Sequence, residues 1–388
     1  RCEKGMNVST LPFQDYSNIH LVGIKGVAMT ALVQCLLDLG KHVSGSDVEE
    51  NFVTKYLLDT FHILVKTGFH ASNISEQSDL VIYTGAHNGN QNPEVIEAKK
   101  RGIPVLNHAE ALELLMQGKR GVAICGVGGK TTTTAMLAWI LESAGQHPSY
   151  AVGVGNIPDL RRTGAYRTDS EWFIAEADEY ATDPGHDNTP RFMHLNPEII
   201  ICAHLAYDHP DIYPSFKATQ DAYLTFFAIL PANGALVVPE EIVSLFGGRL
   251  TALQKEKGYS LLTFVQPDKD VKLKISGQYN RMNAQTALLA AEHMGISREE
   301  ALSALAQFSG TMRRFEHLGS EGGIERYDDY AHHPDEITAV LHSLKETYPV
   351  NNKIVLFQPH TYSRTLSLLN EFSRCFTDAD QVYLLDIF

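Results

Sequence analysis

The sequence has few cysteines, no long apolar run and fewer basic than acidic residues. Its five cysteines are scattered and include no C-x-x-C pair, which argues against a disulfide framework and against structural zinc. No apolar run approaches the roughly 20 residues of a membrane-spanning helix, so no membrane span is expected. With 32 basic against 46 acidic residues, the formal net charge of -14 would repel a phosphate backbone, and a nucleic-acid partner is disfavoured.

The length and the two ends of the sequence indicate how the chain is organised. At 388 residues the chain is too long for one ordinary core, so we expect more than one domain, with clefts between domains. Residues 1–18 are polar and lack the apolar core of a signal peptide, which indicates a cytoplasmic protein. The chain stops at Phe388 directly after a predicted strand, so an incomplete C-terminus is expected. The sequence does not distinguish a monomer from a homodimer.

Strands and helices alternate along the chain, which predicts an α/β fold with parallel sheets. The first domain, residues 1–118, has expected strands at 19–22, 42–46, 80–83 and 104–106 and helices at 29–39 and 93–101. The second, residues 119–312, has strands at 121–125, 172–175 and 199–202 and helices at 283–293 and 298–308. The third, residues 313–388, has strands at 324–327, 353–357 and 382–385.

The strongest motif is G-V-G-G-K-T-T-T-T at residues 126–134, between a predicted strand and a predicted helix. Glycines let backbone N–H groups turn inward around phosphate oxygens, Lys130 can neutralise charge and Thr131 can ligate Mg²⁺. The loop is shortened, because Ile124 stands where the usual pattern has its first glycine. A glycine-rich turn without a ligand is the alternative, but lysine followed by threonine favours ATP. The expected contacts are Gly126, Val127, Gly128, Gly129, Lys130, Thr131 and Thr132.

Two polar clusters follow neighbouring predicted strands. Glu176-Ala177-Asp178-Glu179 comes after strand 172–175, and Asp208-His209 comes after strand 199–202. Ligands gather beyond the carboxyl ends of parallel strands, and carboxylate and imidazole groups there could hold Mg²⁺ between ATP and a second substrate. For an isolated acidic run a solvated loop is the simpler interpretation. The nearby phosphate loop favours a metal site.

The N-terminal turn G-I-K-G-V-A at residues 23–28 occupies the place of a dinucleotide fingerprint. Lys25 and Ala28 replace two of its glycines, so a nicotinamide site is a poor match. Asp47 ends the second strand, as a ribose-binding acid would. A site for one nucleotide diphosphate, with Lys25 meeting the pyrophosphate charge, is the better interpretation.

Seven motifs together resemble the Mur ligases of bacterial cell-wall synthesis. In chain order they are the phosphate loop, E-A-D-E, D-H, G-Q-Y-N-R-M-N-A, R-R-F-E, Y-D-D-Y-A-H-H-P and F-Q-P-H-T-Y-S-R-T. The resemblance implies a Rossmann-like N-terminal domain, a central P-loop ATPase-like α/β domain and a Rossmann-like C-terminal domain. It also implies an ATP-dependent acid–amino-acid ligase that uses Mg²⁺.

The resemblance assigns roles to individual residues. Asn280 and Asn283 would reach the nucleotide, Arg314 would lie near its phosphates and Asp329 near its ribose. Thr131, Glu176 and His209 would hold the metal ions, and the catalytic set would be Lys130, Glu176, His209, Arg314 and Arg364. The UDP-sugar side would comprise Gly23, Lys25, Gly26, Val27, Ala28, Met29, Asp47, Thr84, Gly85, Ala86 and His87. The amino-acid side would comprise His332, His333, His360 and Arg364, with Arg364 as the partner of the substrate carboxylate.

The segment 357–365 resembles the signature of family members that join L-alanine to UDP-N-acetylmuramate. One alternative is a member that reattaches the recycled murein tripeptide L-alanyl-γ-D-glutamyl-meso-diaminopimelate. Another is a non-catalytic nucleotide-sugar-binding protein, motivated by departures from the family pattern at Lys25, Ala28 and Val127-Gly128. Tyr279 and His204 also depart from it, where the family has histidine and asparagine. A simple ATPase or kinase is disfavoured, because the first domain would then have no task.

Overall fold

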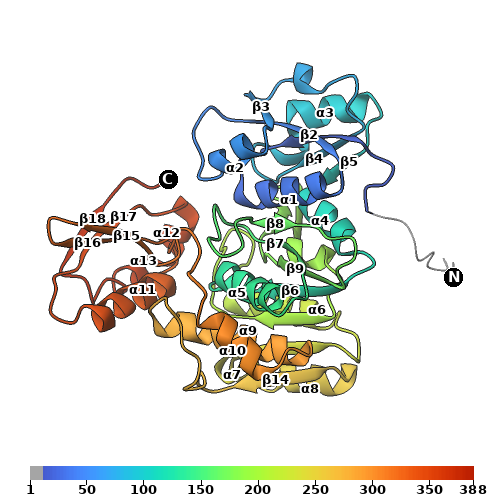
Figure 1. Ribbon diagram of the computed structural model, residues 1–388. Coiled ribbons are helices and arrows are strands. Elements are labelled where there is room, and N and C mark those ends of the chain that lie inside the picture. Colours follow the sequence, from blue (N-terminus) through green and yellow to red (C-terminus); the bar gives the residue numbers. More distant parts are fainter. Residues whose placement is uncertain (1–11) are drawn as a thin grey trace. The chain divides into compact units, whose positions relative to one another are not determined.

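The computed structural model describes residues 12–388, so Cys2 and most of the polar N-terminal stretch lie outside the described residues (Figure 1). The chain forms two compact units. The first comprises the residues up to Ala123 with Gln146–Gly155 and Arg162–Glu198; the second comprises Ile124–Gly145, Asn156–Arg161 and Ile199–Phe388. The boundaries expected near residues 118 and 312 stay predictions.

The first unit contains a five-stranded parallel sheet with the order β3-β2-β1-β4-β5. The central strand β1 pairs with β2 on one side and with β4 on the other, so the strand order reverses direction beside β1. Ligands of open α/β sheets bind at such a reversal, outside the carboxyl ends of the strands. The strands are β1 (Asn18–Val22), β2 (His42–Asp47), β3 (Leu64–Thr67), β4 (Leu80–Tyr83) and β5 (Val105–Asn107).

Helix α1 (Val27–Asp38) is buried on nearly all sides, which explains why its sequence is apolar without a polar stripe. It contacts β2 and also β7 (Ser149–Ala151) and β8 (Gly164–Ala165). The Gln34 amide exchanges hydrogen bonds with the Thr163 hydroxyl and backbone N–H at 2.7 and 3.2 Å. The other helices of this unit are α2 (Lys55–Thr60), α3 (Pro93–Lys100) and α4 (His108–Met116), with short 3₁₀ turns at Ala71–Asn73 and Gly89–Gln91.

A seven-stranded sheet has the order β14-β13-β12-β6-β9-β7-β8. Its further strands are β6 (Arg120–Cys125), β9 (Trp172–Glu176), β12 (Ile199–Cys202), β13 (Ala235–Pro239) and β14 (Ser260–Phe264). A separate hairpin consists of β10 (Ala181–Asp183) and β11 (Asp187–Pro190), followed by a 3₁₀ turn at Arg191–His194.

Helices α5 (Lys130–Ser143), α9 (Gln278–His293) and α10 (Arg298–Leu305) pack together in the second unit. The same unit contains α6 (Phe216–Phe227), α7 (Glu240–Leu245) and α8 (Arg249–Lys257). Helix α9 begins five residues before the expected start at residue 283, because Gly277, with φ 104°, directs the chain into the helix there. Asn280 and Asn283 therefore lie on one helix, close to its N-terminus.

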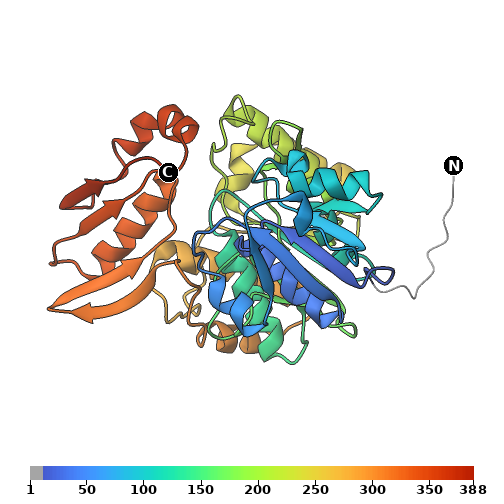
Figure 2. The ribbon, with the colours of Figure 1, turned by 90° about the horizontal axis from the view of Figure 1, so that it is seen from above.

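Residues 313–388 form an α/β segment, coloured orange to red in Figure 2. It contains the hairpin β15 (Glu316–Glu321) and β16 (Ile324–Asp328), and the parallel pair β17 (Ile354–Phe357) and β18 (Gln381–Leu384). Helices α11 (Pro334–Thr347), α12 (Tyr362–Ser367) and α13 (Leu369–Phe372) complete it. Its core includes Ile337 and Leu341 of α11, packed with Phe357, Leu368 and Phe372.

Among residues 12–388, no helix combines the length and apolarity that crossing a bilayer requires. The four cysteines in this range, Cys35, Cys125, Cys202 and Cys375, are buried thiols.

Glu94 is the centre of a buried polar network in the first unit. Its carboxylate accepts hydrogen bonds from the Ser46 hydroxyl at 2.6 Å and the Asn73 amide at 2.7 Å, and it lies 2.9 Å from Nε2 of His20. His20, Ser46 and Glu94 are fully buried. Burial raises the pKa of the Glu94 carboxyl, but the hydrogen bonds from His20, Ser46 and Asn73 outweigh it and lower the pKa below the usual value.

Glu94→Gln should lower the free energy of unfolding by about 3 kcal/mol, because an amide cannot accept all of these hydrogen bonds. Since folding lowers the pKa of Glu94, its contribution is present above the unfolded-state pKa of about 4.3 and is lost as the pH falls through the folded-state pKa. The variant should therefore show a shallower loss of stability in acid. Urea unfolding at several pH values measures both effects. Glu97→Gln on the same helix is the control, because the Glu97 carboxylate pairs with Arg101 and not with the residues of this network; equal behaviour of the two variants would contradict the assignment.

Candidate active site

The phosphate loop lies between the end of β6 and the start of α5, as the sequence predicts. The Lys130 ammonium group folds back over the loop and donates to the Gly126 carbonyl oxygen at 2.6 Å. The Val127 N–H donates to the His204 carbonyl oxygen at 3.0 Å, which ties the loop to the segment after β12. The turn and the positive end of α5 together provide an anion site of the kind that binds phosphates.

Two glycines of this loop are required by their surroundings. Gly126 has φ 131°, and a Cβ atom there would lie 2.6 Å from the backbone oxygen of His204. Gly129 has φ 82°, and a Cβ atom there would lie 2.4 Å from Oδ1 of Asn283. Side chains at either position would combine backbone strain with a steric clash.

A pocket with an empty volume of about 800 Å³ opens beside this loop. Its lining comes from the phosphate loop, from helix α9 and from the C-terminal segment, and includes Gly128, Gly129, Thr132, Tyr279, Asn283, Arg314, Asp329 and Glu336. The structure thus brings together six residues that the sequence and its resemblance place near ATP, from loop, helix and C-terminal motifs: Gly128, Gly129, Thr132, Asn283, Arg314 and Asp329. Asn280, also assigned there, is buried and donates to the Ser276 carbonyl oxygen at 2.7 Å.

Arg314 and Asp329 provide opposite charges at this pocket. Nη2 of Arg314 lies 3.4 Å from Oγ1 of Thr131, and its guanidinium group lies over the Tyr330 ring. Asp329 accepts hydrogen bonds from the Phe315 and Ala331 backbone N–H groups at 2.6 and 2.7 Å. Burial, opposed in part by the Arg314 guanidinium group, raises the pKa of Asp329 to about 6.

The histidines predicted for the amino-acid side have different surroundings. His333 caps α11: its Nδ1 accepts from the Asp335 N–H at 3.2 Å, and its Nε2 lies 3.1 Å from the Tyr207 carbonyl oxygen. Both of its ring nitrogens are therefore engaged by the backbone. His332 and His360 lie with ring centres 6.1 Å apart, and burial lowers the pKa of each. Their contact with a substrate stays a prediction.

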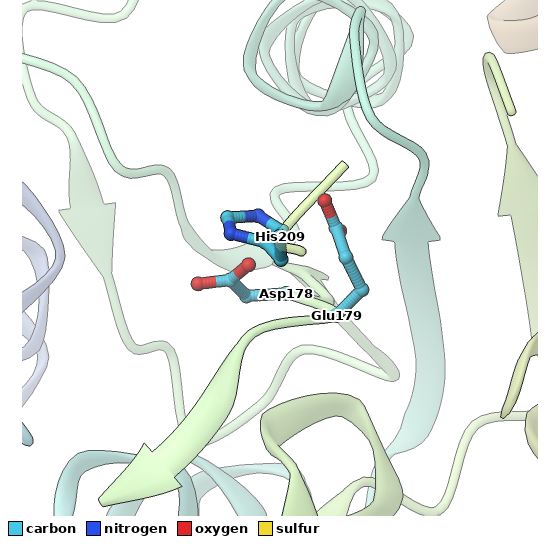
Figure 3. Close-up of side chains that lie close together, drawn as sticks. All are labelled: Asp178, Glu179 and His209. Carbon is cyan, nitrogen blue, oxygen red and sulfur yellow. The ribbon is translucent and has the colours of Figure 1, made fainter. Parts of the chain in front are cut away.

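Acidic and imidazole side chains follow β9 and β12, as the E-A-D-E and D-H motifs predict. Asp178, Glu179 and His209 each offer one ligand atom, and these atoms lie within 4.8 Å of one another (Figure 3). Glu176, which the sequence assigns to the metal, accepts a hydrogen bond from the Gly153 N–H at 2.7 Å. Two carboxylates and an imidazole fit Mg²⁺ or Mn²⁺. Thr131, Glu176 and His209 as metal ligands stay a prediction.

Arg364 forms a buried bidentate ion pair with Asp208. Nε of Arg364 lies 2.7 Å from Oδ1 of Asp208, and Nη2 lies 3.0 Å from Oδ2. The sequence predicts that Arg364 binds the substrate carboxylate, and it gives no sign of the pairing with Asp208. The pairing occupies one edge of the guanidinium fork.

The residues predicted for the UDP-sugar side gather at the carboxyl ends of β1, β2 and β4. Asp47 accepts from the Lys25 N–H at 2.7 Å, and Nε2 of His87 lies 3.6 Å from Oδ1 of Asp47. A Cβ atom at Gly23, which has φ 81°, would lie 2.4 Å from the Thr84 methyl group, so the two turns are in close contact. The Lys25 ammonium group donates to the carbonyl oxygens of Val48 and Glu50 at 2.5 and 2.8 Å. A role for Lys25 at the pyrophosphate stays a prediction.

Sequence reasoning did not assign Glu336 and Tyr279 to the pocket that they line. Glu336 follows two residues after the H-H-P motif, and its carboxylate lies 3.9 Å from Nη1 of Arg314. Tyr279 was identified only as a departure from the family pattern. Its position directly before Asn280, in a motif assigned to the nucleotide, was a usable signal.

A phosphate loop, polar groups at neighbouring strand ends and a separate sheet with a glycine turn define an α/β enzyme that uses nucleotides. Comparison with known proteins narrows this class. Residues 18–120 match the Mur ligase family catalytic domain, residues 124–264 the Mur ligase middle domain and residues 313–387 the Mur ligase glutamate ligase domain. The chain belongs to the Mur ligase family, and the expected three-domain α/β architecture is confirmed.

Individual relatives agree with this membership. The UDP-N-acetylmuramate–L-alanine ligase of Desulfitobacterium hafniense is 34% identical over 392 residues, covering 96% of this chain and 84% of that protein. The crystal structure of the UDP-N-acetylmuramate-alanine ligase from Thermotoga maritima has a TM-score of 0.74 at 25% identity, covering 96% of this chain and 85% of that one. The UDP-N-acetylmuramate:L-alanyl-γ-D-glutamyl-meso-diaminopimelate ligase from Neisseria meningitides has a TM-score of 0.66 at 26% identity, covering 77% of this chain and 100% of that one.

Gly129→Ala should weaken binding of a non-hydrolysable ATP analogue by about a hundredfold, because its methyl group would displace the Asn283 side chain from the pocket. Isothermal titration calorimetry measures this affinity. Gly145→Ala is a matched control at the other end of α5: Gly145 has φ 73°, but nothing lies within 4 Å of its Cβ position. Comparable affinities in the two variants would show that the close approach to Asn283 is unimportant.

Proposed function

We propose that this chain joins L-alanine to the carboxylate of UDP-N-acetylmuramate at the expense of ATP, in cytoplasmic peptidoglycan synthesis. The observation that carries the proposal is the pocket in which the phosphate loop meets Asn283, Arg314 and Asp329. The relative from D. hafniense, whose name states this reaction, supports the choice of substrates.

The reaction requires activation, because a carboxylate does not react with an amine until one of its oxygens becomes a good leaving group. The sugar-linked carboxylate attacks the γ-phosphorus of ATP, which forms an acyl phosphate and releases ADP. The neutral amine of L-alanine then attacks the acyl carbon, and inorganic phosphate leaves with the activated oxygen. Exclusion of water protects the acyl phosphate from hydrolysis.

Lys130 and Arg314 supply positive charge to the phosphates. Lys130 already lies over the loop, and releasing its bond to the Gly126 carbonyl oxygen would let it reach the γ-phosphate. Arg314 stands beside Thr131 at the same end of α5. Positive charge held close to the phosphates stabilises the transition state of phosphoryl transfer. Asn280, Asn283 and Asp329 bind the rest of the nucleotide.

Mg²⁺ would supply further neutralisation of the phosphate charge when bound. We assign its binding to Thr131, Glu176 and His209, with Asp178 and Glu179 as additional carboxylates. The UDP-sugar binds at the glycine turn 23–29, Asp47 and the turn 84–87. We assign the amino-acid side to His332 and His360.

A screen of ADP release with UDP-N-acetylmuramate and single amino acids tests this function. L-Alanine should give the largest kcat/KM, and release should require both the sugar nucleotide and the amino acid. Greater activity with L-alanyl-γ-D-glutamyl-meso-diaminopimelate would identify a recycling ligase instead. Nucleotide-sugar binding without any ADP release would indicate a non-catalytic binding protein.

If the reaction passes through an acyl phosphate, one oxygen atom of the sugar carboxylate must be transferred to inorganic phosphate. If UDP-N-acetylmuramate carries ¹⁸O in its carboxylate, one labelled oxygen per turnover should appear in inorganic phosphate after L-alanine is added. Mass spectrometry of the phosphate measures the transfer. Unlabelled substrate in ¹⁸O-water is the control, since hydrolysis would also label phosphate. Retention of all label in the amide product and unreacted sugar would contradict the mechanism.

A further inference from the structure

Three contacts from the C-terminal segment hold the short segment Tyr207–Asp208–His209 after β12. The Tyr207 ring packs against the core formed by α11, β17 and α13, and the Tyr207 carbonyl oxygen lies 3.1 Å from Nε2 of His333. The third contact is the ion pair of Asp208 with Arg364. These partners lie 126 and 156 residues further along the chain.

The ion pair is the most buried of the three contacts. The side chains of Arg364 and Asp208 are 6% and 3% exposed. Both oxygens of the Asp208 carboxylate are paired, Oδ1 with Nε and Oδ2 with Nη2 of Arg364. Two parallel hydrogen bonds fix both the position and the plane of that carboxylate.

Asp208 in turn constrains His209. Oδ1 of Asp208, which accepts from Nε of Arg364, also accepts from the His209 backbone N–H at 2.7 Å. His209 has φ 56°, a left-handed conformation that is unfavourable for a residue with a side chain. Oδ2 of Asp208 lies 3.6 Å from Nε2 of the His209 imidazole. One carboxylate therefore contacts both the backbone and the ring of His209.

The placement of Arg364 depends on the core of the C-terminal segment. Arg364 lies on α12, and its carbonyl oxygen accepts from the N–H of Leu368, which is buried in that core. The backbone of Arg364 is thus anchored to packed residues. An arginine anchored in this way can hold the Asp208 side chain in a fixed position.

We propose that Arg364 is a positioning residue, which acts through Asp208 to hold His209 in its strained conformation and to present the imidazole to Mg²⁺. This inference rests on the proposed function for its kinetic consequence. The sequence suggests that Arg364 binds the carboxylate of the substrate. In the structure, Nε and Nη2 of Arg364 bind the carboxylate of Asp208 instead.

Two conservative variants, Arg364→Lys and Asp208→Asn, test this role. Lysine keeps the charge of Arg364 but loses the bidentate fork, and asparagine keeps the shape of Asp208 but loses its charge. Both should raise the Mg²⁺ concentration for half-maximal activity by about tenfold, as loss of a supporting contact to a metal ligand does. The KM for L-alanine should stay within about twofold of wild type. The double variant should be no worse than the poorer single variant, since both act through one contact.

A measurement without metal or substrate tests the positioning directly. Amide hydrogen exchange of residues 205–213 should accelerate at least fivefold in both variants, while exchange in α5 stays unchanged and shows that the fold is intact. Arg298→Lys is the matched control, because Arg298 also contacts two carboxylates, those of Asp268 and Glu292, neither of which belongs to this turn. It should change neither exchange nor Mg²⁺ dependence.

The outcomes separate the possible roles. A more than tenfold rise in the KM for L-alanine in Arg364→Lys alone, with unchanged Mg²⁺ dependence, would make Arg364 a substrate ligand and overturn the proposal. Unchanged exchange in residues 205–213 would overturn it as well. If the wild-type protein releases no ADP with UDP-N-acetylmuramate and L-alanine, the proposed function fails, whereas hydrogen exchange still decides the positioning role.

Discussion

The close approach of the phosphate loop to its neighbours is the constraint on which the candidate site depends. Gly126 contacts the His204 backbone and Gly129 contacts Asn283, so the loop is compressed between the segment after β12 and helix α9. Backbone N–H groups can converge on phosphate oxygens only in such a turn, and only glycine tolerates both its dihedral angles and its contacts. The loop, β12 and α9 must therefore be assembled together before a nucleotide can bind.

The C-terminal segment contributes charged side chains to the site around this loop. Arg314 reaches Thr131, Glu336 approaches Gly128 and Arg364 pairs with Asp208. These contacts bring charged side chains to the start of α5, to the phosphate loop and to the segment after β12. Opposite charges in a partly buried site interact more strongly than in water, so the segment controls the electrostatics of the site as well as its shape.

Much of the architecture could be predicted because its signals are local. Strands β4 and β12 have the expected bounds, since runs such as Leu-Val-Ile-Tyr and Ile-Ile-Ile-Cys have no helical period and end at polar residues. The start of α9 was predicted five residues late, because a glycine before Gln278 gives no strong sequence signal for a helix start. Strands β7 and β8 were not predicted: they have three and two residues, and their pairing is determined by contact with α1.

The sequence by itself determined the α/β class, the phosphate loop, the order of the acidic and imidazole motifs and, through their resemblance, the family. These features depend on neighbouring residues or on motif order, which a single chain displays directly. Only the tertiary structure decided which charges meet. The partner of Arg364 lies 156 residues away, His333 caps a helix with both ring nitrogens engaged, and Lys25 binds backbone carbonyl oxygens in the next turn. No local pattern encodes such pairings, because they depend on how distant segments pack and on which buried groups then need a partner.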